Sequence, residues 1–367
     1  MNETALKQMF IHMALFVTTL GAAAAVAGAQ TAPSPALLVL SKRDTTLAIV
    51  DPATLKVTHK APSGPDPHEV VAAPDGKLAY ISNYGFGAYH TISVIDLATA
   101  RPLRTIDVAP LDGPHGLWFA GGKLYFTAEA NKAIGRYDPG TEKIDWILGT
   151  GQNRTHMVLV SPDLARIFTS NVNSGTISII EKSTAPAGGF GPPPGGPPPP
   201  GAGGQPTPRG GPPMPPRATD WNESVIPVGR GSEGFDVSPG GRELWTGNAG
   251  DGTISIIDIS AKKVVATLDA NVKGANRLKF APDGRLVFVS SLGGPDLAVF
   301  DAASRKEVKR IPLGHGAAGI LMQPDGARAY VSCSPDNYVA VIDLRTLEVI
   351  GRLDAGREPD GLAWAAP

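Results

Sequence analysis

An acidic residue recurs at nearly constant spacing along the chain, and this periodicity limits the possible folds more than any other feature of the sequence. It ends an apolar run at Asp51, Asp96, Asp138, Glu181, Asp258, Asp301 and Asp343. Successive positions are 45, 42, 43, 77, 43 and 42 residues apart. The long interval contains a 34-residue low-complexity segment, residues 185–218, and without it the spacing is regular. The chain therefore contains seven copies of a unit of about 43 residues.

Each unit has the sequence pattern of several short β-strands. Apolar runs of four to seven residues, such as 78–82 and 287–290, are separated by turn residues. The Pro-Asp-Gly turns at 74–76, 282–284 and 324–326 favour hairpins. We found no convincing helical period outside the N-terminal segment. The pattern predicts an all-β fold, a seven-bladed β-propeller of four-stranded antiparallel blades.

The two ends of the repeat region complement each other. The first unit, residues 36–64, lacks its leading strand, whereas residues 359–365 match only that strand. We therefore expect the C-terminal strand to complete the first blade, which would leave no sheet edge open in the ring.

The second strands carry a recurrent four-residue motif. It reads Tyr-Ile-Ser-Asn at 80–83, Phe-Thr-Ser-Asn at 168–171, Trp-Thr-Gly-Asn at 245–248 and Tyr-Val-Ser-Cys at 330–333. With the strands that follow it, this motif resembles the YVTN-repeat family of seven-bladed propellers, including exported bacterial members. The third unit, at 114–118 and 124–127, is more similar to streptogramin-lyase repeats. The resemblance implies the fold and leaves the function open, because propellers have many functions.

The N-terminus has the features of an export signal. Lys7 precedes an apolar stretch at 9–26, and Ala27-Gly28-Ala29 supplies the small residues of a cleavage site. We expect a signal peptide at 1–29 and one mature propeller domain at 30–367, in a periplasmic or secreted protein. An uncleaved membrane anchor is the alternative. After cleavage we expect a monomer with no transmembrane span.

Composition excludes several functions. The 33 basic and 34 acidic residues give a net charge of −1 without a basic stripe, which argues against nucleic acid as a partner. The one cysteine, Cys333, excludes an intrachain disulfide, a Cys-rich metal site and covalent c-type haem. Cys333 lies on a repeat strand, so we interpret it as a buried structural thiol. The Gly-x-Gly-x-x-Gly motif at 229–234 joins two expected strands rather than opening a helix, so it does not indicate a dinucleotide site.

The segment 185–218 is rich in proline and glycine. It contains 14 prolines and 10 glycines in 34 residues, so we expect it to be disordered or polyproline-like. It interrupts blade four between the expected strands 176–180 and 224–228, on the face of the Pro-Asp-Gly turns. A tolerated surface insertion is one interpretation, and a docking arm for an envelope protein is the other.

One position of the repeat brings polar residues together at the mouth of the expected channel. Alignment of the seven innermost strands places these residues in one ring: His68, His115, His156, Glu233, Asn276, Ala318 and Asp360. Imidazole and carboxylate groups are ligands for zinc and similar divalent metals. We therefore consider His68, His115, His156 and Glu233 as a metal site. The alternatives are a polar pocket for an organic ligand, or residues that only bond the incoming turn.

Further candidates lie on the same face. The loop 83–90 brings Tyr84, Phe86, Tyr89 and His90 towards the mouth as possible ligand-binding residues. Other candidates on this face are Glu69, Glu129, Asn131, Asn171, Asn173, Asn248, Asn276, Arg277 and Asp360.

Three functional hypotheses follow. The first is a non-catalytic exported propeller that binds a small ligand, a metal or an envelope protein at the histidine face. The second is a lactonase-like hydrolase or lyase that uses a divalent metal, with Glu129 as a possible catalytic base. The third is a haem-binding propeller, which rests on a similarity to the haem d1 propellers.

Overall fold

The structure is a computed structural model that describes residues 35–183 and 220–366. The predicted signal peptide at 1–29 and the predicted disordered insert at 185–218 lie outside the described residues. Among the described residues, no helix is long and apolar enough to cross a membrane. One short 3-10 helix, η1 (Gly85–Gly87), interrupts an otherwise all-β structure.

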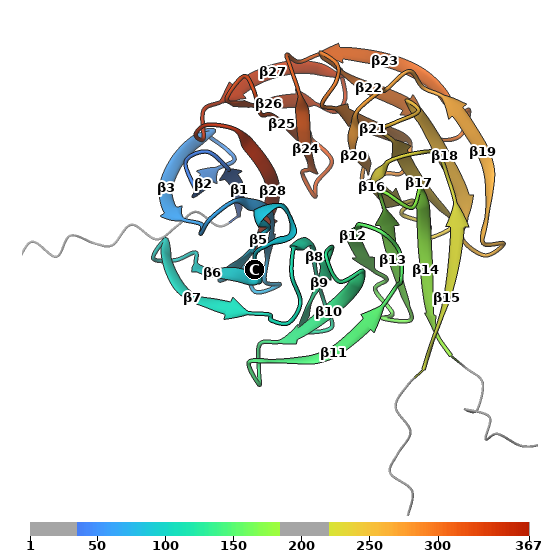
Figure 1. The fold of residues 1–367 in the computed structure, drawn as a ribbon. Coiled ribbons are helices and arrows are strands. Elements are labelled where there is room, and N and C mark those ends of the chain that lie inside the picture. Colours follow the sequence, from blue (N-terminus) through green and yellow to red (C-terminus); the bar gives the residue numbers. More distant parts are fainter. Residues whose placement is uncertain (1–34, 184–219, 367) are drawn as a thin grey trace, which may run out of the picture. The chain divides into compact units, whose positions relative to one another are not determined.

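Seven four-stranded antiparallel sheets form a ring, as the repeat predicted (Figure 1). From the inner to the outer strand, the first blade contains β28 (Pro359–Ala365), β1 (Ala36–Ser41), β2 (Thr46–Asp51) and β3 (Lys56–Pro62). The second contains β4 (Pro67–Ala72), β5 (Leu78–Asn83), β6 (Thr91–Asp96) and β7 (Arg101–Asp107). The third contains β8 (Pro114–Ala120), β9 (Lys123–Ala128), β10 (Ala133–Asp138) and β11 (Lys143–Gly149).

The other four blades have the same order. The fourth contains β12 (Thr155–Val160), β13 (Arg166–Asn171), β14 (Thr176–Lys182) and β15 (Trp221–Pro227). The fifth contains β16 (Ser232–Val237), β17 (Glu243–Asn248), β18 (Thr253–Asp258) and β19 (Lys263–Asp269). The sixth contains β20 (Ala275–Phe280), β21 (Leu286–Ser291), β22 (Asp296–Asp301) and β23 (Lys306–Pro312). The seventh contains β24 (Ala317–Met322), β25 (Arg328–Cys333), β26 (Tyr338–Asp343) and β27 (Glu348–Leu353).

The first blade is built from both ends of the described chain. Strand β28 pairs antiparallel with β1, with Leu37 opposite Trp364 and Val39 opposite Leu362. Figure 1 shows the red C-terminal strand beside the blue strands of this blade. The predicted closure is confirmed, and the inner strands contact one another around the ring.

The hydrophobic core lies between adjacent blades. The two middle strands of a blade are almost completely buried, as in β1, whereas an outer strand such as β3 alternates exposed and half-buried residues. Trp245, Tyr80 and Tyr330 are the largest fully buried side chains. Cys333 is buried and free, as expected. Because burial of apolar side chains between the blades stabilises the fold, polar residues can line the central channel without disrupting the core.

The recurring acid that revealed the repeat shapes a turn, as predicted for a strand-end residue. Asp51 Oδ1 accepts a hydrogen bond from the Ala53 amide at 2.9 Å, and Asp343 Oδ1 accepts one from the Arg345 amide at 2.9 Å. Asp138 also accepts from the amide two residues on, and the acids that accept from the amide three residues on are Asp96, Asp258 and Asp301. Glu181 differs, because it pairs with Lys262 at 2.7 Å instead.

The inner strands have a shared irregularity that shapes the channel. In each of them the pairing register shifts at the ring position, as between Pro67 and Val70 of β4. Such a β-bulge lets two consecutive residues face the same side. Both Asn276 and Arg277 consequently line the channel.

Candidate functional site

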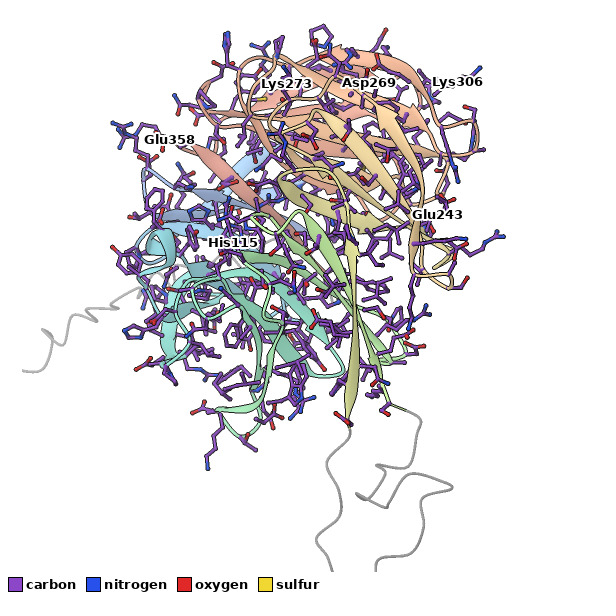
Figure 2. All side chains as sticks on the ribbon, turned by 45° about the vertical axis from the view of Figure 1, so that its right-hand side comes forward. His115, Glu243, Asp269, Lys273, Lys306 and Glu358 are labelled. Carbon is purple, nitrogen blue, oxygen red and sulfur yellow. The ribbon has the colours of Figure 1, made fainter. Side chains whose placement is uncertain are left out.

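The seven aligned ring positions line one cavity of about 370 Å³, which we call the histidine cavity. Each is the second residue of an inner strand: His68, His115, His156, Glu233, Asn276, Ala318 and Asp360. Figure 2 shows His115 among the inner strands, whereas Lys306 lies at the periphery of the ring. The structure thus brings together residues that are up to 292 positions apart in sequence (68 and 360). Three imidazoles from consecutive blades lie at one side of this cavity.

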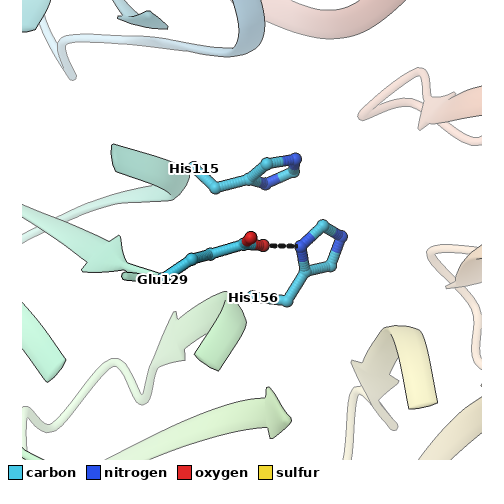
Figure 3. A group of neighbouring side chains, drawn as sticks. All are labelled: His115, Glu129 and His156. Carbon is cyan, nitrogen blue, oxygen red and sulfur yellow. Dashed lines mark hydrogen bonds and ion pairs between the residues drawn. The ribbon is translucent and has the colours of Figure 1, made fainter. Parts of the chain in front are cut away.

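His156 is held between two carboxylates. Its Nδ1 makes a short hydrogen bond to Glu129 Oε1, drawn as a dashed line in Figure 3, and its Nε2 lies 3.0 Å from Glu233 Oε2. Burial opposes protonation of this imidazole, but Glu233 and Glu129 outweigh burial and raise its pKa. Both nitrogens of His156 thus face a carboxylate, although its buried Nε2 makes no hydrogen bond within the described residues.

The two carboxylates have further partners. Tyr84 Oη donates to Glu129 Oε2 at 2.5 Å. Arg154 lies between the acids, with its Nε 3.4 Å from Glu129 Oε2 and its Nη1 3.1 Å from Glu233 Oε1. Burial works to raise the pKa of Glu233, but His156 and Arg154 overcome it and lower that pKa to about 2. Both acids are ionised and compensated.

His115 has the opposite character. Its ring lies 3.9 Å, centroid to centroid, from that of His156, and it is buried. Burial, reinforced by the charge on His156, holds the pKa of His115 well below its ordinary value. Its Nδ1 is buried and has no hydrogen-bond partner within the described part of the chain. His115 is thus a neutral imidazole with unused hydrogen-bonding capacity.

His68 belongs to a separate polar group. Its Nε2 lies 3.3 Å from Asp66 Oδ1, and its Nδ1 lies 3.7 Å from Asp360 Oδ2. Lys42 Nζ approaches both sides of this group, at 3.4 Å from His68 Nδ1 and 3.5 Å from Asp360 Oδ2. His68 thus has a carboxylate near each ring nitrogen, although its buried Nε2 makes no hydrogen bond within the described residues.

An ion pair crosses the channel beneath the ring. Arg277 of β20 donates a short hydrogen bond from its Nη2 to Glu69 Oε1 of β4, and its Nη1 contacts Asn276 Oδ1 at 3.3 Å. Burial works to lower the pKa of Arg277, but Glu69 and Asp360 raise it. Arg277 therefore remains a cation inside the channel.

The side chains that approach closely enough to share a metal ion differ from the predicted set. Among the described residues, one group has ligand atoms within 4.8 Å of one another, and it comprises His115, Glu129 and His156 (Figure 3). His68 and Glu233 are outside this group. Because Glu233 and Glu129 raise the pKa of His156, binding of an ion here would compete with protonation of that imidazole.

Several other predicted residues lie away from the cavity lining. His90 pairs with Asp107 at 2.8 Å on the surface, and Phe86 and Tyr89 are 88% and 40% exposed. Asn131 accepts a hydrogen bond from the Asp112 amide at 2.5 Å and so connects two loops. Asn171 and Asn248 bond hydroxyl groups within their own blades, and Asn173 is exposed.

Sequence reasoning missed Lys42 and Arg154. Arg154 lies two residues before the ring position, where the backbone is left-handed in all seven blades. Four blades have glycine at this position, namely Gly113, Gly231, Gly274 and Gly316, and three have Asp66, Arg154 and Glu358. A charged residue at a position suited to glycine is strained, and such strain often accompanies function. An alignment of the repeats therefore singles out Asp66, Arg154 and Glu358, because glycine occupies their position in the other four blades.

Comparison with known proteins supports the fold. A model of the YNCE-like β-propeller family matches residues 7–141, which agrees with the YVTN-type repeat. No curated protein matches the chain in sequence.

Three solved structures share the propeller fold at low sequence identity. A protein of unknown function from Desulfotomaculum acetoxidans DSM 771 has a TM-score of 0.68 at 12% identity, over 91% of this chain and 100% of that one. A Bacteroides fragilis NCTC 9343 protein with a provisional 6-phosphogluconolactonase name has a TM-score of 0.66 at 14% identity, over 90% and 98%. The dihydro-haem d1 dehydrogenase NirN has a TM-score of 0.58 at 15% identity, over 87% of this chain and 63% of that one. At these identities the likeness concerns the fold alone.

Proposed function

We propose that the chain is an exported binding protein whose histidine cavity holds a small hydroxylated organic molecule at His115. One observation carries this proposal. Each charged side chain that lines the cavity faces a group of opposite charge. His156 and His68 likewise face carboxylates, whereas His115 has no ion-pair partner and its buried Nδ1 has no hydrogen-bond partner among the described residues. A neutral imidazole offers one donor and one acceptor, and a hydroxyl group complements both.

Binding is favoured over catalysis by the protonation states. A general base works best with a pKa near the working pH. The pKa of His115 is held well below its ordinary value, and Glu233 and Glu129 favour the protonated form of His156, which cannot accept a proton. The site therefore supplies fixed hydrogen-bonding groups rather than an efficient proton acceptor.

Calorimetric titration of D-gluconate and D-glucose into the mature protein tests the proposal. We expect saturable binding of at least one of these probes. His115→Gln should weaken it about tenfold, the equivalent of ~1.4 kcal/mol, whereas His59→Gln, on the outer strand β3, should not. Arg154→Gly serves as a second variant, because glycine suits the left-handed backbone while the ion pairs to Glu129 and Glu233 are lost. It should weaken binding without unfolding the protein. Absence of saturable binding of both probes, or equal binding by the two histidine variants, refutes the proposal.

A metal-assisted, lactonase-like hydrolase is the second candidate, favoured by the convergence of His115, Glu129 and His156. The provisional name of the Bacteroides fragilis protein points the same way. A divalent ion bound there would polarise the carbonyl of a lactone. In the same titrations Zn²⁺ should then bind more tightly at pH 8 than at pH 6, because His156 must lose its proton. His156→Gln should abolish this binding and His68→Gln should not. That pattern, together with hydrolysis of glucono-δ-lactone, would favour the enzyme over the binder.

Export is the other part of the proposal. It is supported by Lys7, the apolar stretch at 9–26 and the small residues Ala27-Gly28-Ala29. The intact mass of protein isolated from the cell envelope or medium should correspond to a chain that begins at Gln30. A mass that includes residues 1–29 would contradict cleavage.

A further inference from the structure

The central channel contains a second cavity beyond the Glu69–Arg277 ion pair. It has a volume of about 310 Å³, and we call it the apolar chamber. All seven inner strands contribute to it, through residues further along each strand than the ring positions. Arg277 lines both cavities. The ion pair therefore divides one channel into a polar and an apolar compartment.

The walls of the apolar chamber include aromatic side chains that pack against the inter-blade clusters yet keep part of their surface exposed. Trp118, Phe119 and Trp364 line it and are only half-buried, whereas Trp245 and Phe288 of the inter-blade core are completely buried. Concave apolar surface with a few polar groups is typical of small-molecule sites, whose volumes begin at about 300 Å³. The chamber has the size and the lining of such a site.

One cation in the chamber wall is weakly paired. Three charged residues line the chamber, Glu69, Arg277 and Lys279. The first two neutralise each other. Lys279 Nζ lies 3.8 Å from Asp236 Oδ1, outside hydrogen-bond range, and its side chain is 31% exposed. The other oxygen of Asp236 accepts a hydrogen bond from the Phe280 amide at 3.0 Å. The three lining groups carry a net charge of +1, which Asp236 balances from outside the lining without a hydrogen bond to Lys279.

We propose that the apolar chamber binds a small amphipathic anion, with its apolar body against Trp118, Phe119 and Trp364 and its carboxylate on Lys279. The walls provide the hydrophobic contact, and Lys279 provides a charge-assisted hydrogen bond inside a partly desolvated channel. This site is distinct from the histidine cavity and does not depend on its ligand.

Titration of 2-naphthoate into the full chain tests this proposal, with 2-naphthalenemethanol as the uncharged analogue. Calorimetry gives the affinities, and tryptophan fluorescence reports on the site directly because Trp118 and Trp364 line it. We expect saturable binding of both probes, with 2-naphthoate binding more tightly.

Matched variants separate the charge from the apolar contact. Lys279→Gln should weaken 2-naphthoate about tenfold, the equivalent of ~1.4 kcal/mol, and leave 2-naphthalenemethanol unchanged. Lys306→Gln, an exposed lysine on β23 (Figure 2), should leave both affinities unchanged. Phe119→Ala should weaken both probes. Thermal unfolding of each variant verifies that the fold is retained.

The outcomes distinguish this site from the histidine cavity. His115→Gln should not alter binding of 2-naphthoate, so either proposal can fail while the other stands. Absence of saturable 2-naphthoate binding to the folded wild-type protein overturns the apolar site. Equal effects of Lys279→Gln and Lys306→Gln overturn the role of Lys279.

Discussion

At the scale of single residues, two neighbouring histidines have pKa values that are shifted in opposite directions. Burial works to lower the pKa of His156 but Glu233 and Glu129 raise it, whereas burial and the neighbouring His156 lower the pKa of His115. The imidazole centroids are only 3.9 Å apart. Contacts with carboxylates, rather than residue type, therefore decide which histidine carries a proton.

This difference predicts two opposite pH dependences of stability. The pKa of His156 is raised on folding, so its stabilising effect is present below about pH 6.5 and is lost as pH rises through its folded pKa. The pKa of His115 is lowered, so its effect is complete above about pH 6.5 and is lost as pH falls below that value. Each slope approaches about 1.4 kcal/mol per pH unit at most.

Urea unfolding of the wild type, His156→Gln and His115→Gln between pH 5 and 9 measures these slopes. The stability difference between wild type and His156→Gln should shrink above pH 6.5, and that for His115→Gln should shrink below it. Contributions from the surface pair His90–Asp107 cancel, because all three proteins contain it. Parallel curves for the two variants would contradict the assigned charge states.

At the scale of elements, four of the seven inner strands have glycine directly after the ring position, where the other three have Glu69, Met157 and Arg277. Gly116, Gly234, Gly319 and Gly361 occupy this level in four blades. A Cβ on Gly319 would lie 2.2 Å from the Asp360 carbonyl oxygen, and one on Gly234 would lie 2.5 Å from the Asn276 carbonyl oxygen. At these glycines the neighbouring inner strand approaches so closely that a side chain does not fit without a backbone shift.

We expect Gly319→Ala to lower the free energy of unfolding by about 1–3 kcal/mol, the usual cost of overpacking. Gly149→Ala on the outer strand β11 is the matched control, because nothing lies within 4 Å of its Cβ position and its φ is not left-handed. That control should change stability by less than about 0.5 kcal/mol. Chemical unfolding of both variants measures these changes in the free energy of unfolding. Equal stabilities of the two variants would show that the strands can separate at no cost.

At the scale of the whole molecule, closure of the ring creates the channel and both of its cavities. Strand β28 supplies Asp360 to the histidine cavity and Trp364 to the apolar chamber, and it also completes the first blade. Arg277 and Glu69 come from blades that are not adjacent in the ring, so they can meet only across the channel. The same pairing of chain ends thus stabilises the fold and assembles both sites.

The sequence alone determined the number of blades, their four-stranded order, the closure by residues 359–365 and the ring of seven positions. Each of these follows from a spacing that repeats along the chain. Because the blades are related by symmetry, residues at the same position of the repeat lie at the same level of the channel. The left-handed positions of Asp66, Arg154 and Glu358 were also accessible from the aligned repeats, because glycine occupies that position in the other blades.

Only the tertiary structure decided how the side chains within the ring divide into groups. It joined His115 and His156 with Glu129, left His68 with Asp66 and Asp360, and placed Arg277 against Glu69. A repeat fixes the level of a residue along the channel, but the rotamer, the partner and the proton depend on the side chains that differ from blade to blade. Those differences lie across the ring rather than along the chain, so a periodic spacing carries no information about them.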